Sequence, residues 1–213
     1  TPCGTLFPYT TLFRSPEHFW WYLNKGSGFF NTELNVEEAK QYELAFGQSL
    51  SDTLDIAIRG YYYDIEDYIG STFVPGTGSV IYNIEDVEVK GAEAEVSVRL
   101  PRNFRLWANF TWQDGDKDGD PWDSENRLSN ELPDFPDTMF NIGMDYRGDR
   151  LRAHFSLNYV SSREHYDGEE LVELDDYTLL NFSTSYRLWQ SKARRLEILF
   201  SGENLLDQDY EEK

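Results

Sequence analysis

The segment from Met139 to Tyr159 alternates apolar and polar residues with a period of two, and this alternation constrains the fold more than any other feature of the chain. The side chains of a β-strand point alternately to its two faces, so each half of the segment is predicted to be a strand with one apolar and one polar face. Gly148 and Asp149 lie between the halves and predict a tight turn, and hence an antiparallel hairpin. The apolar positions are Phe140, Ile142, Met144, Tyr146, Leu151, Ala153, Phe155, Leu157 and Tyr159.

The same alternation recurs along the chain and predicts about eight strands. The six others are expected near residues 41–50, 54–69, 80–100, 104–112, 180–188 and 196–203. Short connections near residues 51, 102, 148 and 191 alternate with long ones at 70–79, 114–136, 162–176 and after Glu203. Strands of about ten residues joined in this way are typical of outer-membrane barrels. A bulge is expected near Gly91, because Val87 and Val89 are out of phase with the residues that follow.

The composition is compatible with a membrane barrel. No apolar run approaches the ~18 residues that a membrane helix needs. The mean hydropathy of -0.63 does not argue against a barrel, whose strands hide their apolar residues by alternation. The net charge of -20 argues against nucleic acid as a partner. Cys3 is the only cysteine, so the chain has neither a disulfide framework nor a thiolate metal site.

The polar faces of the predicted strands carry charges, and this decides which face is inside. The charged residues on these faces include Glu93, Glu95, Arg99, Arg105, Arg152, His154 and Arg187. A small soluble barrel has an apolar interior. We therefore predict an all-β fold: an antiparallel up-and-down transmembrane β-barrel, in part, with its apolar face toward lipid and its polar face toward a watery lumen. The alternative is a soluble lipocalin-like ligand-binding barrel, in which Phe155, Leu157, Phe182 and Ile198 would pack in a core.

The acidic segment from Asp114 to Glu125 (DGDKDGDPWDSE) matches the pattern of an EF-hand calcium loop. That pattern works by arranging carboxylate oxygens around one ion. Its flanks are predicted strands rather than helices, and Pro121 replaces a residue that usually has a free amide. We therefore expect an acidic solvent loop and assign no cofactor, with loop calcium as the alternative. The same acidic character at 162–176 suggests either a solvated surface or a mouth that attracts cations.

His154 and Ser156 share one face of a predicted strand, which raises a third hypothesis, an outer-membrane hydrolase. Catalysis would need a carboxylate to orient His154, and the sequence shows none nearby. His18 and His165 lack partners at metal-ligand spacing. We therefore predict that the chain is not an enzyme and assign it no catalytic and no metal-binding residue.

The first fifteen residues are unlike the rest. Thr5 to Ser15 (TLFPYTTLFRS) resembles the translation of a widely used sequencing adapter. We expect residues 1–15 to be a non-native, adapter-derived segment, with the native chain beginning near Pro16.

Five motifs in order resemble the C-terminal β-barrel part of TonB-dependent outer-membrane receptors. They are NTELNVEEAKQYELAF from Asn31, YYYDIEDYI from Tyr61, NIEDVEVKGAEAEV from Asn83, LPDFPDTMF from Leu132 and ENLLDQDY from Glu203. The similarity covers nearly everything after residue 30. It implies that residues 16–213 are an incomplete C-terminal part of a large, plugged barrel, which is preceded in the family by a plug region.

The resemblance also implies a location and a function. The family resides in the Gram-negative outer membrane and couples TonB to the uptake of scarce ligands, most often ferric siderophores. The expected partners are outer-membrane lipid, an iron chelate or similar small ligand, and TonB through the plug region. Ligand contacts would fall to the long loops at 70–79, 114–136 and 162–176, where Trp122 and Tyr166 are the candidate contact residues.

Overall fold

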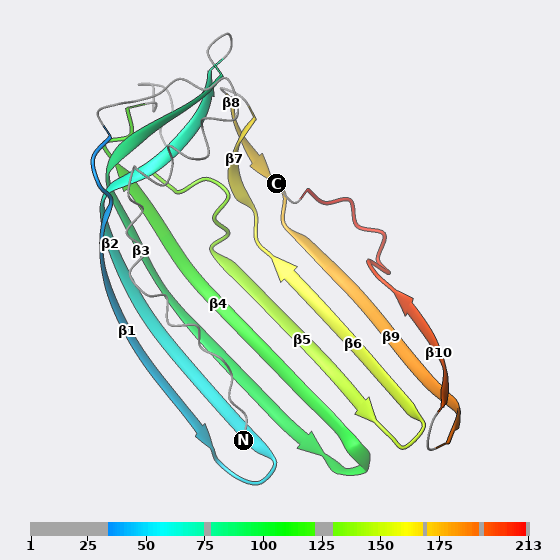
Figure 1. The fold of residues 1–213 in the computed structure, drawn as a ribbon. Helices are drawn as coiled ribbons and strands as arrows, with labels where there is room; N and C mark the ends of the chain where they lie inside the picture. Colours follow the sequence, from blue (N-terminus) through cyan, green and yellow to red (C-terminus); the bar gives the residue numbers. More distant parts are fainter. Residues whose placement is uncertain (1–33, 75–77, 122–129, 168–169, 192–193, 212–213) are drawn as a thin grey trace.

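The computed structural model describes residues 34–74, 78–121, 130–167, 170–191 and 194–211 of the 213-residue chain. Eight antiparallel strands form one curved, open sheet in the order β1-β2-β3-β4-β5-β6-β9-β10, and β7 pairs with β8 in a separate hairpin (Figure 1). The strands are β1 Glu38–Ser49, β2 Leu54–Val74, β3 Gly78–Leu100, β4 Phe104–Asp118, β5 Thr138–Arg147, β6 Leu151–Val160, β7 Arg163–Asp167, β8 Glu170–Leu174, β9 Tyr177–Gln190 and β10 Arg195–Gly202. The predicted all-β antiparallel sheet of about eight strands is confirmed. Among the described residues, no helix has the length and apolar character needed to cross a membrane.

The four short connections lie together at one end of the sheet, as predicted (Figure 1). The β5–β6 connection is a tight turn in which the Gly148 N–H donates to the Leu151 carbonyl at 2.9 Å. The β3–β4 connection is the 3-10 turn η1, Pro101–Asn103, where Arg102 and Asn103 have φ values of 65° and 67°. We call this the turn end of the sheet, and the opposite end, which carries the β7–β8 hairpin, the loop end.

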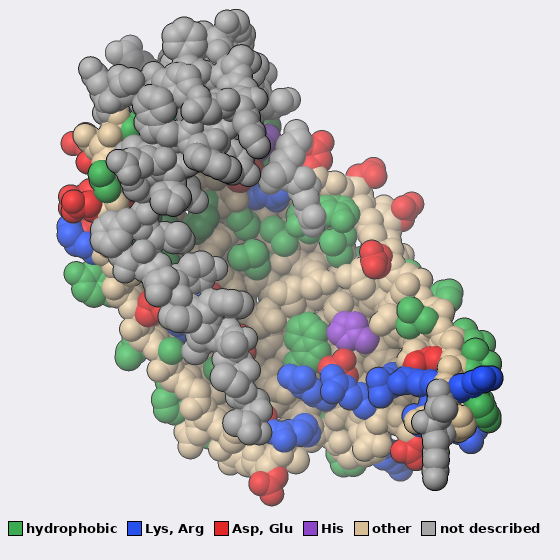
Figure 2. Space-filling model, in the orientation of Figure 1, with side chains coloured by type: hydrophobic (Ala, Val, Ile, Leu, Met, Phe, Trp, Pro, Cys, Tyr) green, Lys and Arg blue, Asp and Glu red, His purple; other side chains and the backbone are tan. Residues whose placement is uncertain are grey.

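The strand register sorts apolar and polar side chains onto opposite faces. Leu44, Ile58 and Phe110 on the convex face are 81 %, 56 % and 44 % exposed. The concave face bears Arg59 and Glu93 and encloses an open hollow of about 820 Å³, which Figure 2 shows from the inside. An apolar convex surface and a polar concave surface are the arrangement of a membrane barrel wall.

The lipocalin-like alternative is therefore wrong. It required Phe155 and Ile198 to pack in a core, but these side chains are 38 % and 57 % exposed. The opposite face of the same strands bears charged side chains such as Arg152, Arg187 and Glu197, which would be costly to bury in a dry interior.

Strands β2 and β3 are longer than predicted, and their register contains no bulge. Pairing continues from Leu54↔Val98 to Val74↔Gly78, so the expected loop at 70–79 is for the most part strand, and the expected bulge near Gly91 does not exist. The unbroken register places Val87 and Val89 on the concave face with Glu93. The phase change in the sequence marks a change of environment: toward the loop end Val87 is only 1 % exposed, and Ile69, Ile81 and Ile84 are buried as well.

Two other expected loops contain strand. Asp114 to Asp118 continue β4 and pair with β3, so the predicted loop at 114–136 begins later. The predicted loop at 162–176 holds the β7–β8 hairpin, in which Arg163 lies opposite Leu174. Both segments are acidic, and their charge led to the prediction of loops. Pairing with a neighbouring strand makes them extended instead.

Glu37 and Asn83, which belong to two of the motifs above, join the start of β1 to the β2–β3 hairpin. The Asn35 N–H donates to Asn83 Oδ1 at 2.8 Å, and Asn83 Nδ2 donates to the Asp67 carbonyl at 2.7 Å. The carboxylate of Glu37, 6 % exposed, accepts from the Ile69 N–H at 3.1 Å. These contacts give both motif positions a structural role, because each satisfies backbone groups that would otherwise lack partners.

Candidate functional site on the concave wall

An indole and an imidazole lie together near the middle of the concave wall. The ring of Trp107 (β4) is stacked on that of His154 (β6), with centroids 6.2 Å apart and planes inclined by 13°. Asp145 (β5) fixes His154 through an Nδ1–Oδ1 contact of 2.9 Å. Gly143, opposite Trp107 in the ladder, leaves the space that the indole fills.

Four asparagines on neighbouring strands form a continuous amide ladder on the same wall. Asn141 donates to Asn109 Oδ1 at 2.7 Å and accepts from Asn158, which in turn accepts from Asn181 at 3.1 Å. The ladder ends at the backbone N–H of Asn204, which donates to Asn181 Oδ1 at 2.9 Å. Each internal amide thus both donates and accepts, which gives an uncharged polar strip across β4, β5, β6 and β9.

A second cluster lies on the part of the wall formed by β1, β2 and β3. Arg59 pairs with Glu93 at 2.8 Å, and Tyr63 donates to Glu43 at 2.5 Å. Tyr61 stacks on Tyr63 with centroids 5.2 Å apart. Opposite charges here are paired between neighbouring strands along the wall.

Arginines gather toward the turn end of the concave wall. Figure 2 shows basic side chains in a row across the lower part of the hollow face. We define the basic belt as the arginines that the strand register places on this face, one on each of β3, β4, β5, β6 and β9: Arg99, Arg105, Arg147, Arg152 and Arg187. In the sheet these five strands are consecutive neighbours.

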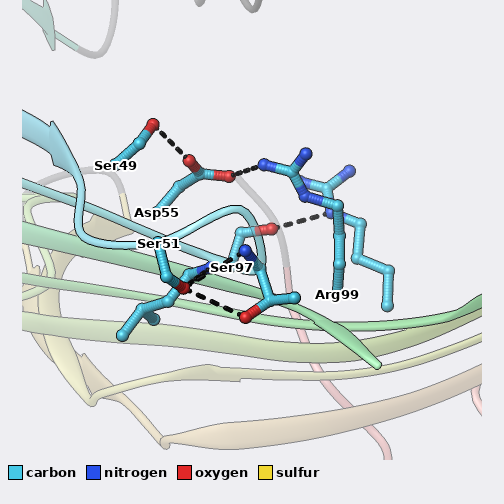
Figure 3. Close-up of polar contacts among 8 residues, drawn as sticks. Ser49, Ser51, Asp55, Ser97 and Arg99 are labelled. Atoms are coloured by element: carbon cyan, nitrogen blue, oxygen red, sulfur yellow. Dashed lines mark hydrogen bonds and ion pairs between the residues drawn. The ribbon is translucent and has the colours of Figure 1, made fainter. Parts of the chain in front are cut away.

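At one end of the basic belt, one arginine forms an ion pair and the next one a hydrogen bond. Asp55 accepts from Ser49 at 2.6 Å and pairs with Arg99 at 2.5 Å (Figure 3). Arg105 donates from Nε to the Ser97 hydroxyl at 2.9 Å. The contacts thus lock the guanidinium groups of β3 and β4 against neighbouring strands.

The centre of the basic belt consists of two arginines that face each other. Arg147 and Arg152 lie directly opposite each other in the β5–β6 ladder and line an open hollow with Gly148. Like charges directly opposite each other in a sheet repel. Glu197, which pairs with Arg195 at 2.5 Å, also interacts electrostatically with Arg152 and offsets part of this repulsion.

The residues predicted to contact ligand lie at the loop end or outside the described residues. Trp122 falls outside them. Tyr166 lies in β7 opposite Leu171, and its side chain is not described. The role of both residues in ligand binding therefore stays a prediction.

The acidic segment that matched the calcium pattern is extended. Asp114 lies in β4 and pairs with Lys90 at 2.7 Å on the convex side, while Lys117 on the opposite face pairs with Asp120 at 2.8 Å. Glu125 lies outside the described residues. Among the residues that the structure describes, no group of three His, Cys, Asp or Glu side chains could hold a metal ion.

The hydrolase hypothesis gains its carboxylate but lacks an accessible nucleophile. Asp145 orients His154, the contact that the sequence did not reveal. Ser156 is only 6 % exposed, and no hydrogen bond to His154 is recorded among the described residues. A nucleophile must reach its substrate, so this arrangement does not support hydrolysis.

Sequence reasoning identified the charged wall but missed the asparagine ladder and the centre of the belt. Each consists of residues of one type, asparagine or arginine, that lie side by side because of the register between neighbouring strands. The available signal was four asparagines at polar-face positions of strands that are neighbours in the sheet.

The chain matches known proteins over nearly its whole length. The sequence profile described as "TonB dependent receptor-like, beta-barrel" matches residues 7–205. The iron-regulated outer membrane virulence protein of Vibrio cholerae serotype O1 is 23 % identical over 94 % of this chain and 33 % of that protein. The chain thus spans about a third of the length of the curated relatives it matches.

Solved structures show the same fold. The copper transporter OprC aligns with a TM-score of 0.69 at 19 % identity, over 84 % of this chain and 27 % of that one. The ferric yersiniabactin uptake receptor FyuA from Yersinia pestis aligns with a TM-score of 0.63 at 20 % identity, over 82 % and 26 %. These similarities concern the curved barrel wall.

Proposed function

This chain belongs to the TonB-dependent receptor β-barrel family of the Gram-negative outer membrane, and from that premise we propose that it forms part of a receptor for TonB-coupled uptake of a ferric siderophore. The observation that supports transport is the wall itself, apolar on its convex face and polar on its concave face. Such a wall separates lipid from a hydrated lumen.

Two of the three named proteins support iron as the cargo: one is called iron-regulated, and one is a receptor for ferric yersiniabactin. The third, OprC, is a copper transporter. The names of the two solved structures concern a receptor and a transporter, in line with the expectation that the chain is not an enzyme. In this proposal outer-membrane lipid contacts the convex face, an iron chelate enters the lumen, and TonB acts through the plug region of the complete protein.

The test is iron uptake by cells that carry the complete gene. Cells that express the receptor should accumulate radioactive iron from a ferric siderophore, and deletion of TonB should abolish this accumulation. An expressed, folded receptor that neither binds nor imports any ferric chelate would contradict the proposal.

Ligand contact at the loop end has its own test. In the complete receptor, Trp122→Ala together with Tyr166→Ala should weaken siderophore binding by about tenfold or more, because aromatic side chains carry much of the energy of a binding surface. Trp189→Ala, at the turn end of β9, is the control and should leave binding unchanged. Unaltered affinity in the double variant would remove both residues from the ligand site.

A further inference from the structure

The stacked rings of Phe104 and Tyr146 join two neighbouring turns at the turn end of the sheet. Phe104 directly follows η1, the β3–β4 turn, and Tyr146 lies two residues before Gly148 of the β5–β6 turn. The two are direct partners across the β4–β5 ladder, and their ring centroids are 4.8 Å apart. The register that places Phe110 on the convex face places both rings there as well. They form an aromatic floor between the two turns on the side that meets lipid.

Each of the two turns carries an arginine directly beyond the apolar surface. Arg102 lies in η1 two residues after Leu100, and Arg150 directly precedes Leu151. Leu100 and Leu151 are exposed on the convex face. Both arginines are exposed, and among the described residues neither side chain has an ion-pair or hydrogen-bond partner. The apolar surface therefore ends at two guanidinium groups that the fold itself does not use.

Strand length fixes the depth of these arginines in the membrane. Strands β5 and β6 have ten residues each, which is about the length that a tilted strand needs to cross the bilayer. Their turn must therefore lie where hydrocarbon meets headgroups. The β3–β4 turn lies beside it at the same end (Figure 1). Short turns of outer-membrane barrels are periplasmic, so both arginines lie at the headgroups of the inner leaflet.

The hydroxyl group of Tyr146 lies at the same edge. A Cβ added to Gly148 would be 2.6 Å from this hydroxyl oxygen, so the side chain reaches over the turn. In the described part of the chain the hydroxyl has no hydrogen-bond partner. A tyrosine at a membrane interface keeps its ring in the apolar layer and its hydroxyl among the headgroups. The two turns hold two arginines and one acid, Asp149, so their net charge is positive.

We propose that the aromatic floor and the two turn arginines form a binding site for an anionic phospholipid of the inner leaflet. The phosphodiester accepts hydrogen bonds from the guanidinium groups of Arg102 and Arg150, and the Tyr146 hydroxyl donates to an oxygen of the headgroup. The acyl chains lie along the exposed apolar side chains of β4 and β5. A lipid with a net negative charge binds better than a zwitterionic one, because the turns are positive. This site concerns how the barrel is held in the membrane, and it does not depend on the cargo.

The experiment measures which lipid the purified complete receptor retains. The receptor is mixed in mild detergent with equal amounts of phosphatidylglycerol and phosphatidylethanolamine of the same acyl chains, and bound lipid is counted by native mass spectrometry. The wild type should retain phosphatidylglycerol in preference. Arg102→Gln/Arg150→Gln should lower this preference by about tenfold or more, since each arginine near an anionic headgroup contributes about a factor of five. Tyr146→Phe keeps the ring and should lower retention of phosphatidylglycerol by about threefold.

Two matched variants control for charge and for geometry. Arg147→Gln/Arg152→Gln removes the same charge from the same end of the sheet, but from the concave face, and should keep the wild-type preference between lipids. Arg102→Lys/Arg150→Lys keeps the charge of the turns and should recover much of the preference. The folded fraction of each variant is measured by its heat-modifiable mobility on electrophoresis.

Three outcomes would overturn the proposal. Equal retention of the two lipids by the wild type would show that the turns do not select a headgroup. An equal loss of preference in the two Gln double variants would show a response to overall charge rather than to a site. Loss of the preference in excess inorganic phosphate would show that the turns take a soluble anion. None of these outcomes bears on iron uptake, so the proposed function is tested separately.

Discussion

The indole ring of Trp107 lies over Gly143, its direct partner across the β4–β5 ladder, and a Cβ built on that glycine would overlap the ring. The absence of a side chain at 143 is therefore what lets Trp107 lie flat against the wall and stack on His154. A glycine in a strand interior often marks such a close approach.

Gly143→Ala should displace Trp107 and destabilise the barrel by about 1–3 kcal/mol, the usual cost of overpacking. The measurement is the apparent melting temperature of the complete receptor in detergent. Gly47→Ala is the control: this glycine lies on the same face, and the nearest atom to its Cβ would be 3.8 Å away, an ordinary contact. Equal melting temperatures for the two variants would show that Gly143 is not needed for the ring.

Substitution of an interior asparagine of the amide ladder should destabilise the barrel. Asn141→Leu removes the donor to Asn109 and the acceptor for Asn158, so each of these two part-buried amides loses one hydrogen bond. We expect a loss of about 1–3 kcal/mol in the free energy of unfolding. Ser183→Ala, on the same wall, has no recorded hydrogen bond among the described residues and should cost much less. Urea titration of both variants makes the comparison.

The ion pair of Lys117 and Asp120 should matter because it is buried. The two side chains are 1 % and 4 % exposed and 2.8 Å apart. Lys117→Met removes the positive charge next to a buried carboxylate and should destabilise the protein by about 3–5 kcal/mol. The double variant Lys117→Met/Asp120→Leu should regain most of that loss. A single variant as stable as wild type would show that water reaches Asp120.

Glu131 should make stability depend on pH. It lies between β4 and β5 and forms a β-bridge with Asp116 of β4. Partial desolvation of its carboxyl group, together with the charges of Glu164 and Asp137, raises the pKa of that group. Above its ordinary pKa of 4.5 the folded state therefore binds more protons than the unfolded state, so stability falls as pH rises through this window.

Glu131→Gln should accordingly raise the melting temperature at neutral pH and reduce the gain that wild type shows on acidification. Asp149→Asn, in the turn after β5, serves as the control because it lies at the opposite end of the sheet. The melting temperature is measured for all three proteins at about pH 7 and about pH 5. A variant with the same pH dependence as wild type would contradict the assignment to Glu131.

The sequence predicts those parts of this fold that depend on local periodicity. Alternation from Phe140 to Tyr159 identifies the hairpin, its turn and its two faces, because each depends on residues near one another in the chain. The register of one strand against its neighbour cannot be predicted from local periodicity. The contacts of Asn141 with Asn109 and of His154 with Asp145 join residues 32 and 9 positions apart, and their geometry depends on how neighbouring strands align.

Local periodicity was also misleading at one place. Val87 and Val89 looked like a break in the pattern, but the strand continues and its environment changes from hydrated to buried. A shift from polar to apolar on one face and an inserted residue produce the same signal in a sequence. Only the partner strand distinguishes them.

The length of the β2–β3 hairpin has a mechanical consequence. Strands of 21 and 23 residues are about twice as long as the ten or so needed to cross a bilayer, so close to half of the hairpin lies beyond the lipid. The ladder is interrupted at Asp67, whose φ is 56°, and the strands pair again on its far side. The outer half is therefore a paired ribbon that can bend at this point relative to the barrel wall, as Figure 1 shows.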